Sequence, residues 1–394
     1  MKKSVFLFYM ASFVLFFGGS NVLYAIGYYN IPFLSKLSPA FALYVVALIL
    51  ILNGKLFYKS FELCVFAYML SLNLMTYLMV GELYVHESLT SIVFPPLFLI
   101  LLKGVEEKVS WDYLVNMVYI FLIVNSILAI CEFVRGSIFF PTMPNGEKLY
   151  SFYFRSMALK GHPLSNSGIT SSIMIFIMLY CQSRIRKILM LMLGFAAILC
   201  FNSRFSLVIS GVMFAIFVLH EIFIGKVKFR WRFFYVFSVV AMTALTIYLF
   251  NAGWGSRLIE NGLVGDDSSM VRIEIIKIFD YGLTTFLTGK SSYEIDCLLY
   301  GMGFRGIVEN CWILFMLRYG VPAVALGLYL YYLLFKKTMC GMNFFEKFFV
   351  MTPWLVSISS SNSIAVGGMG ICTQMLLIFI FKRQSSFVEN RRDI

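Results

Sequence analysis

Twelve runs of apolar residues, most of them long enough to cross a bilayer, divide this chain from one end to the other. They fall near 5–26, 38–53, 61–80, 90–102, 113–133, 165–181, 188–201, 205–224, 233–250, 309–335, 347–363 and 367–381. A helix needs about 20 mainly apolar residues to span a hydrocarbon core of about 30 Å. The sequence therefore predicts an all-α integral membrane protein with about twelve transmembrane helices, in which residues 1–394 form a single polytopic domain.

The composition supports this interpretation. Hydrophobic residues make up 60% of the chain and charged residues only 13%, and the mean hydropathy is +0.84. A soluble domain has about 25% charged residues, so soluble, disordered and fibrous classes are excluded. No small-residue cleavage site follows the first run, and we expect that run to be a retained helix rather than a removed signal peptide.

The basic residues predict how the helices are oriented. If the N-terminus is cytoplasmic, every loop on that side has at least two Lys or Arg residues, which together are about 20 of the 32 in the chain. These loops lie near 2–3, 55–59, 103–108, 184–187, 226–232, 336–347 and 382–392. Both termini are then cytoplasmic, and the net charge of +12 reflects topology rather than nucleic-acid binding.

Two long segments, 135–164 and 251–308, fall on the outer side of the membrane. The cytoplasmic connectors are short, and no Gly-rich phosphate-binding loop followed by Lys and Ser or Thr is present. We therefore expect any chemistry at the outer membrane face, without a cofactor. The eight cysteines form no zinc-type spacing, and a Cys297–Cys311 bridge is a minor alternative. Glu294 and Asp296 also allow a metal site, but this spacing is common by chance, so we predict no metal.

The first periplasmic loop combines aromatic and basic residues. Tyr150, Phe152, Tyr153 and Phe154 precede Arg155, and the loop ends in Gly161-His162-Pro163. Aromatic faces stack on sugar rings, and arginine pairs with phosphate through two hydrogen bonds. The alternative is a loop lying on the membrane, with its aromatics in the interfacial belt and Arg155 on lipid headgroups.

The large periplasmic loop contains one predicted helix. A cap at Asp267 or Ser268 and the spacing of Ile273, Ile276 and Phe279–Tyr281 predict a short amphipathic helix over 269–281 that carries Arg272. Arg257 precedes this helix. The stretch that follows it is rich in glycine, is predicted to be flexible, and leads to Arg305.

Two further arginines lie in or beside apolar runs. Arg204 stands at the outer end of the eighth run, where a charge is costly unless it is paired or hydrated. Arg318 follows Glu309 by nine residues, about 13 Å along a helix, so the two point in opposite directions and Arg318 needs another partner or a wet cavity. Arginine clusters bind pyrophosphate well, which favours a transferase whose leaving group is a lipid pyrophosphate.

Three stretches resemble the O-antigen polymerases (Wzy-type) and the related O-antigen ligases. The first runs from Arg155 through Gly161-His162-Pro163 to Asn166, and the second is Asn202-Ser203-Arg204. The third is the large loop with Arg257 and Arg272, followed by Gly301–Gly303, Glu309-Asn310 and Tyr319-Gly320. The resemblance covers about residues 150–335. The ligases have a histidine before that Asn, where this chain has Glu309, which favours the polymerase.

The resemblance implies a GT-C-like, metal-independent, inverting glycosyltransferase of the bacterial inner membrane. It would move a growing glycan from undecaprenyl pyrophosphate onto a new undecaprenyl-pyrophosphate-linked repeat unit. The implied catalytic residues are Glu309, Arg204 and Arg272. The implied substrate-binding residues are Arg155, His162, Asn166, Arg257, Arg305, Asn310 and Arg318. A co-polymerase that regulates chain length is an expected partner.

Two rival functions remain open. A ligase would transfer the glycan to lipid A–core instead of to a new repeat unit. A lipid-oligosaccharide flippase or transporter also suits twelve spans, but transporters usually show paired halves and ionisable groups near the midplane. The two halves of this chain show no clear similarity.

Overall fold

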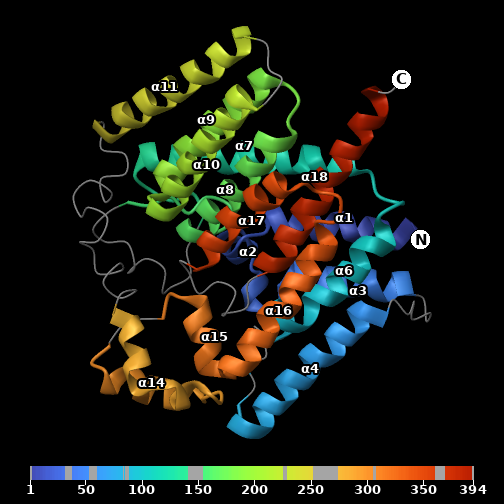
Figure 1. Cartoon of the computed structure of the whole chain (residues 1–394), viewed down its shortest axis with the longest axis vertical. Coiled ribbons are helices and arrows are strands. Elements are labelled where there is room, and N and C mark those ends of the chain that lie inside the picture. The colour runs from blue at the N-terminus through green and yellow to red at the C-terminus, as the bar shows by residue number, and fades with distance from the viewer. Residues whose placement is uncertain are drawn as a thin grey trace.

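The chain is a bundle of helices (Figure 1). The computed structural model describes residues 2–31, 38–52, 60–82, 84, 88–140, 154–224, 229–251, 274–304, 308–359 and 369–392. Every regular element within these residues is a helix, and none is a strand. The prediction of an all-α protein is confirmed for this part of the chain.

Each of the twelve apolar runs contains a helix. In chain order the α-helices are α1 (Lys2–Phe17), α2 (Ser20–Ala25), α3 (Pro39–Leu52), α4 (Ser60–Val80), α6 (Phe94–Val105), α7 (Trp111–Arg135), α8 (Pro163–Tyr180), α9 (Arg184–Phe201), α10 (Arg204–Phe223), α11 (Phe229–Asn251), α14 (Ser292–Gly301), α15 (Cys311–Tyr319), α16 (Val321–Thr338), α17 (Phe344–Ser359) and α18 (Gly370–Arg392). Short 3₁₀ and π turns are η1 (Tyr28–Asn30), η3 (Ser88–Val93), η5 (Ile275–Tyr281) and η6 (Leu283–Phe286).

Helices α4, α7, α10 and α11 are, among the described residues, long and apolar enough to cross a membrane. Their outward faces are apolar as well: Leu78 of α4 and Phe233 of α11 are each more than 70% exposed. Large apolar side chains exposed along whole helices are characteristic of a surface that faces lipid rather than water. The structure is therefore compatible with a membrane protein.

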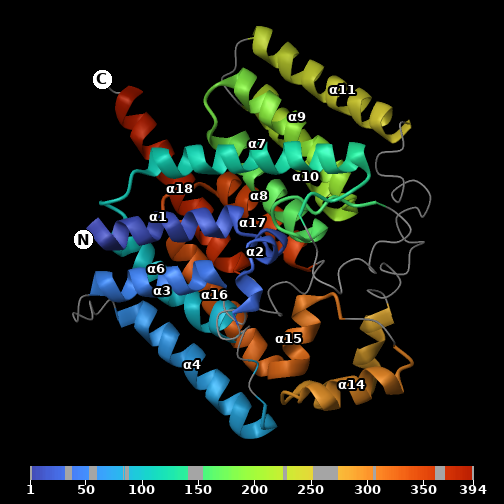
Figure 2. The same ribbon diagram turned by 180° about the vertical axis from the view of Figure 1, so that it is seen from behind.

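Helix α8 forms the centre of the bundle. It packs against α7, α9, α10, α17 and α18, and Ile173–Met178 are almost completely buried. Helices α4 and α11 lie at opposite edges of the molecule, and the two chain ends lie at the same edge in both views (Figures 1 and 2). The polar side chains of α8 are therefore surrounded by protein, which is where a membrane protein tolerates them.

Two of the predicted continuous helices are broken. The first run separates into α1 and α2 at Gly18-Gly19, and the tenth separates into α15 and α16 at Gly320. A Cβ atom on Gly19 would lie 1.8 Å from the carbonyl oxygen of Leu159, so glycine lets another part of the chain cross here. Gly320 has a φ of 83°, which other residues rarely adopt, and Pro322 follows.

The second long loop, residues 251–308, also differs from its prediction. Residues 252–273 lie outside the described part, and Ile275–Tyr281 form 3₁₀ turns rather than the end of an α-helix. Ile275 and Ile278 are buried in these turns, whereas Ile276 and Phe279 are exposed. The stretch predicted to be flexible contains α14. Ser291 and Glu294 form a capping box at its start, in which each side chain accepts a backbone N–H of the other residue.

Candidate functional site

The end of the first long loop, which the sequence predicts to be periplasmic, is buried within the bundle. Residues Ser156–Leu159 are at most 6% exposed, and they lie between the ends of α7, α8 and α9. We call residues 154–162 the anchored segment. Non-helical backbone at this depth needs partners from the protein for its N–H and C=O groups. The aromatic residues Tyr150, Phe152 and Tyr153 lie outside the described residues.

Glu132, in the last turn of α7, is the main anchor of this segment. It is completely buried, and its Oε2 accepts hydrogen bonds from Ser156 Oγ and from the N–H groups of Met157 and Ala158, both at 2.9 Å. Its Oε1 accepts the N–H of Phe139 at 3.1 Å. Ala158 has a φ of 36°, which lets successive N–H groups converge on one carboxylate. The sequence reasoning missed Glu132, although an acid inside an apolar run is itself a signal.

Two asparagines complete the anchoring. Asn125 of α7 accepts the N–H of Leu159 at 3.2 Å. Asn166 of α8, which is completely buried, donates to the carbonyl groups of Met157 and His162 and accepts the N–H of Lys160 at 3.2 Å. Both ends of the Asn166 amide are therefore used inside the protein, and the side chain positions the segment rather than reaching into open space.

The anchored segment places three polar side chains of different accessibility. Arg155 is 9% exposed, and its Nε donates to the carbonyl of Phe201 at the end of α9, at 3.0 Å. Lys160 donates to the carbonyl of Leu15 and lies 5.8 Å from the centre of the Phe121 ring. Burial lowers the pKa of Lys160 to about 7. His162 is exposed just before α8.

Arg204 begins α10 immediately beside this group. Asn202, with a φ of 53°, ends α9, so only Asn202 and Ser203 connect the two helices, as predicted. Ser206 links α10 to the start of α8, because its Oγ lies 3.1 Å from that of Ser167. Arg155 and Arg204 therefore both lie close to the end of α9, and the Nη1 atom of Arg204 is buried.

Glu309 and Asn310 lie at the start of α15. Asn310 Oδ1 accepts the N–H groups of Trp312 and Ile313 at 3.0 and 3.2 Å, so this side chain caps the helix. Trp312 Nε1 donates to Ser359 Oγ of α17 at 2.7 Å. Helix α17 also touches the first turns of α8, where a Cβ on Gly168 would lie 2.3 Å from Ser357 Oγ. Helix α17 therefore contacts both the start of α15 and the start of α8. Glu309, which is half-buried, lies at the same end of the bundle as the anchored segment.

The tenth run, predicted as one helix containing Arg318, is divided into α15 and α16. Arg318 lies in the last turn of α15, just before the break at Gly320, and its guanidinium carbon is 4.4 Å from the centre of the Tyr84 ring. Tyr84 in turn donates to the carbonyl of Lys290 at 2.8 Å. Arg318 was predicted to need a partner, and the aromatic face of Tyr84, in the segment after α4, is one.

The structure brings together only part of the predicted site. Arg155, His162, Asn166 and Arg204 lie near the start of α8, the end of α9 and the start of α10, while Glu309 and Asn310 are connected to this region through α15 and α17. Arg318 stands at the opposite end of α15. Arg257, Arg272 and Arg305 lie outside the described residues.

Neither minor alternative for the outer loops is supported. Within the described ranges, no three His, Cys, Asp or Glu side chains come together in a way that would hold a metal ion. Glu294 is used in the capping box of α14. Cys297 is an exposed free thiol and Cys311 a buried one, so the suggested disulfide between them is wrong.

The chain matches no family model and no curated protein sequence.

Proposed function

We propose that this chain is a surface-polysaccharide (O-antigen) polymerase of the bacterial inner membrane. In this proposal it has about twelve spans in a GT-C-like arrangement, with both termini cytoplasmic and the site facing the periplasm. It moves a growing glycan from undecaprenyl pyrophosphate onto the terminal sugar of a new lipid-linked repeat unit. A chain-length-regulating co-polymerase is its expected partner.

The observation that carries the proposal is the pair of arginines at the end of α9. Arg155 and Arg204 come from segments 49 residues apart in sequence. Backbone N–H groups of the first segment donate hydrogen bonds to Glu132, Asn125 and Asn166, which hold it in place. Two guanidinium groups, partly shielded from water, are well suited to bind a pyrophosphate. The exposed His162 offers a further contact for the sugar or phosphate.

The chemistry follows from these groups. The acceptor hydroxyl attacks the anomeric carbon of the donor sugar, a new C–O bond forms, and the bond from that carbon to the pyrophosphate oxygen breaks. Arg204, together with Arg272 and either Arg155 or Arg305, stabilises the negative charge that the pyrophosphate gains as it leaves. Glu309 accepts the proton of the acceptor hydroxyl. Attack from the face opposite the leaving group inverts the anomeric configuration.

The glycan profile of a null strain tests this function. Loss of a polymerase leaves lipopolysaccharide capped with a single repeat unit. Polymer stranded on undecaprenyl pyrophosphate would instead indicate a ligase, and loss of periplasmic repeat units altogether would indicate a flippase or transporter. Either of these two outcomes would overturn the proposal.

A further inference from the structure

Two lysines share one buried carboxylate where α4 begins. Glu62, in the first turn of α4, is 1% exposed, and its Oε1 forms ion pairs with Lys103 of α6 and, at 3.5 Å, with Lys337 of α16. The Nζ atom of Lys337 also lies 3.6 Å from the centre of the Phe61 ring. We call Glu62 and the two lysines the basic cluster. Because one carboxylate neutralises only one ammonium group, the basic cluster has an excess of one positive charge.

The lysines of the basic cluster remain accessible from outside the protein. Their side chains are 25% and 40% exposed, whereas the carboxylate that they share is covered. An ammonium group has three N–H donors, so a lysine that pairs with Glu62 can also donate to a second acceptor. Glu62 therefore holds the two cations from the protein side, and their exposed surface is available to an anion.

The basic cluster lies at a level of the molecule that suits a lipid headgroup. Its lysines belong to the segments 103–108 and 336–347, which the basic residues predict to be cytoplasmic. Helix α4 is long and apolar enough to cross a membrane, and its Leu70 and Leu74 are 49% and 58% exposed. Basic sites between transmembrane helices on the cytoplasmic side bind the headgroups of anionic lipids. The position therefore favours a lipid of the cytoplasmic leaflet.

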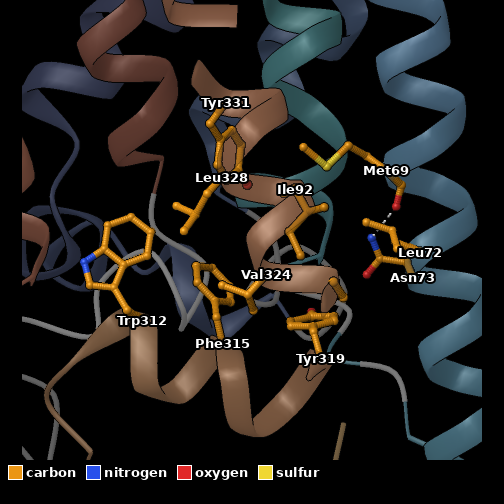
Figure 3. Close-up of a pocket in the computed structure, with 12 residues that line it drawn as sticks. Met69, Leu72, Asn73, Ile92, Trp312, Phe315, Tyr319, Val324, Leu328 and Tyr331 are labelled. Carbon is orange, nitrogen blue, oxygen red and sulfur yellow. Dashed lines mark hydrogen bonds between the residues drawn. The ribbon is translucent and has the colours of Figure 1, made fainter. Parts of the chain in front are cut away.

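A pocket between α4, α15 and α16 begins one to two helical turns from the basic cluster (Figure 3). Met69 of α4 and Tyr331 of α16 lie toward one end of this pocket, and Tyr319 of α15 lies toward the other. Glu62 precedes Met69 by seven residues and Lys337 follows Tyr331 by six, so the basic cluster lies about 10 Å along these two helices from the first end.

The pocket offers an apolar surface. It encloses about 440 Å³, its open mouth included, and Leu72, Val324 and Leu328 are among the residues that line it. The indole N–H of Trp312, also in the wall, already donates to Ser359. An acyl chain suits such a surface because it needs no hydrogen bonds. The pocket and the basic cluster therefore match the two parts of a lipid that joins an acyl chain to an anionic headgroup.

We propose that the basic cluster and the pocket together bind an anionic phospholipid of the cytoplasmic leaflet, such as phosphatidylglycerol. Its phosphate contacts Lys103 and Lys337, and one acyl chain follows the pocket between α4 and α16. A zwitterionic lipid such as phosphatidylethanolamine brings an ammonium group that the lysines repel, so the site prefers the anionic lipid. The inference goes beyond the proposed function and does not depend on it, because this lipid is not a reactant.

The experiment measures the binding of phosphatidylglycerol and of phosphatidylethanolamine to the full chain in detergent, by native mass spectrometry with each lipid titrated. We expect the wild type to bind phosphatidylglycerol more tightly. Lys337→Gln should weaken that binding about fivefold and leave the affinity for phosphatidylethanolamine unchanged. Lys336→Gln is the matched control, since it removes the same charge from the adjacent, exposed lysine and should bind both lipids like the wild type.

Two further variants separate the headgroup site from the pocket and from folding. Lys337→Arg keeps the charge and should bind phosphatidylglycerol like the wild type, even if Lys337→Gln is less stable. Gly327 lines the pocket, and a Cβ added there would meet no atom within 4 Å, so Gly327→Leu should fill the space of the acyl chain and weaken the binding of both lipids.

Three results would overturn the proposal. A wild type without preference for phosphatidylglycerol would contradict it as a whole. Equal losses of phosphatidylglycerol binding in Lys337→Gln and Lys336→Gln would show a general effect of surface charge instead of a headgroup site. Unchanged binding of both lipids to Gly327→Leu would show that no acyl chain occupies the pocket.

Discussion

The anchored segment and the region around α14 are both non-spanning parts of the predicted outer side, but they are attached to the bundle in different ways. The first is buried, and interior side chains such as Glu132 and Asn166 hold its backbone. Helix α14 is largely exposed: Tyr293 and Tyr300 are 77% and 79% accessible. Its start is held by Glu82 and by its own capping box, both at the surface.

This difference separates the proposed site into a rigid half and a more loosely held half. A backbone segment that is fixed by buried, charge-assisted hydrogen bonds unfolds only when much of the protein unfolds with it. An exposed helix with few core residues can unfold locally. Arg155 and Arg204 belong to the rigid half, as a preorganised pyrophosphate site requires. If the proposed function is correct, we expect the exposed α14 region to be the part that moves as lipid-linked substrates enter and leave.

Removing the main anchor should have the largest effect. Glu132→Ala leaves the buried N–H groups of Met157 and Ala158 without an acceptor, which costs about 3 kcal/mol or more. We expect a fall of several degrees in the melting temperature in detergent, measured by intrinsic fluorescence. Glu107→Ala, at an exposed acid, is the control. A Glu132→Ala protein as stable as this control would contradict the picture of a rigid half.

Lys160 should make the anchored segment sensitive to pH. Its pKa of about 7 is below the ordinary lysine value of 10.5, so the folded protein binds fewer protons than the unfolded chain between these values. Stability should therefore rise as the pH increases from 7 toward 10. Melting temperatures across this range should rise less steeply for Lys160→Met than for the wild type.

The exposed Lys108 provides the control for that titration. Lys108→Met should keep the wild-type slope. The assignment to Lys160 fails if Lys160→Met also keeps the full slope.

The smallest effect is expected in the α14 region. Ser291→Ala removes the cap of α14, worth about 1 kcal/mol. Because α14 is exposed, its amides should exchange with deuterium about fivefold faster while the global melting temperature stays within about 1 °C. A large drop in the melting temperature would show instead that α14 is part of the same cooperative unit as the anchored segment.

The sequence predicted the helices well because apolar runs are local. It did not predict the breaks at Gly19 and Gly320, since these depend on Leu159 and Leu287 crossing from distant parts of the chain. It placed Asn202-Ser203 correctly as a short connection. Helix α14 was not predicted, although Ser291 and Glu294 have the capping-box spacing, because the glycines around it are typical of a flexible loop.

The site was predicted only in part, for a similar reason. Arg155 and Arg204 could be selected as outer-face arginines without a topological role, but their meeting at the end of α9 depends on how the first loop folds into the bundle. Glu132 was not predicted as a site residue. Its function as an anchor is visible only when the N–H groups of Met157 and Ala158, 25 and 26 residues away, converge on its carboxylate.

In the proposed function, Arg204 and its neighbours promote glycan transfer from a lipid pyrophosphate. The most direct test is polymerisation of lipid-linked repeat units by the purified chain in detergent, with neither nucleotide nor ion gradient. We predict a polymer ladder from the wild type and from Arg186→Ala, an exposed arginine of α9, and at least a 100-fold slower reaction from Arg204→Ala. No polymer from the wild type, or a full ladder from Arg204→Ala at equal expression, would contradict the account.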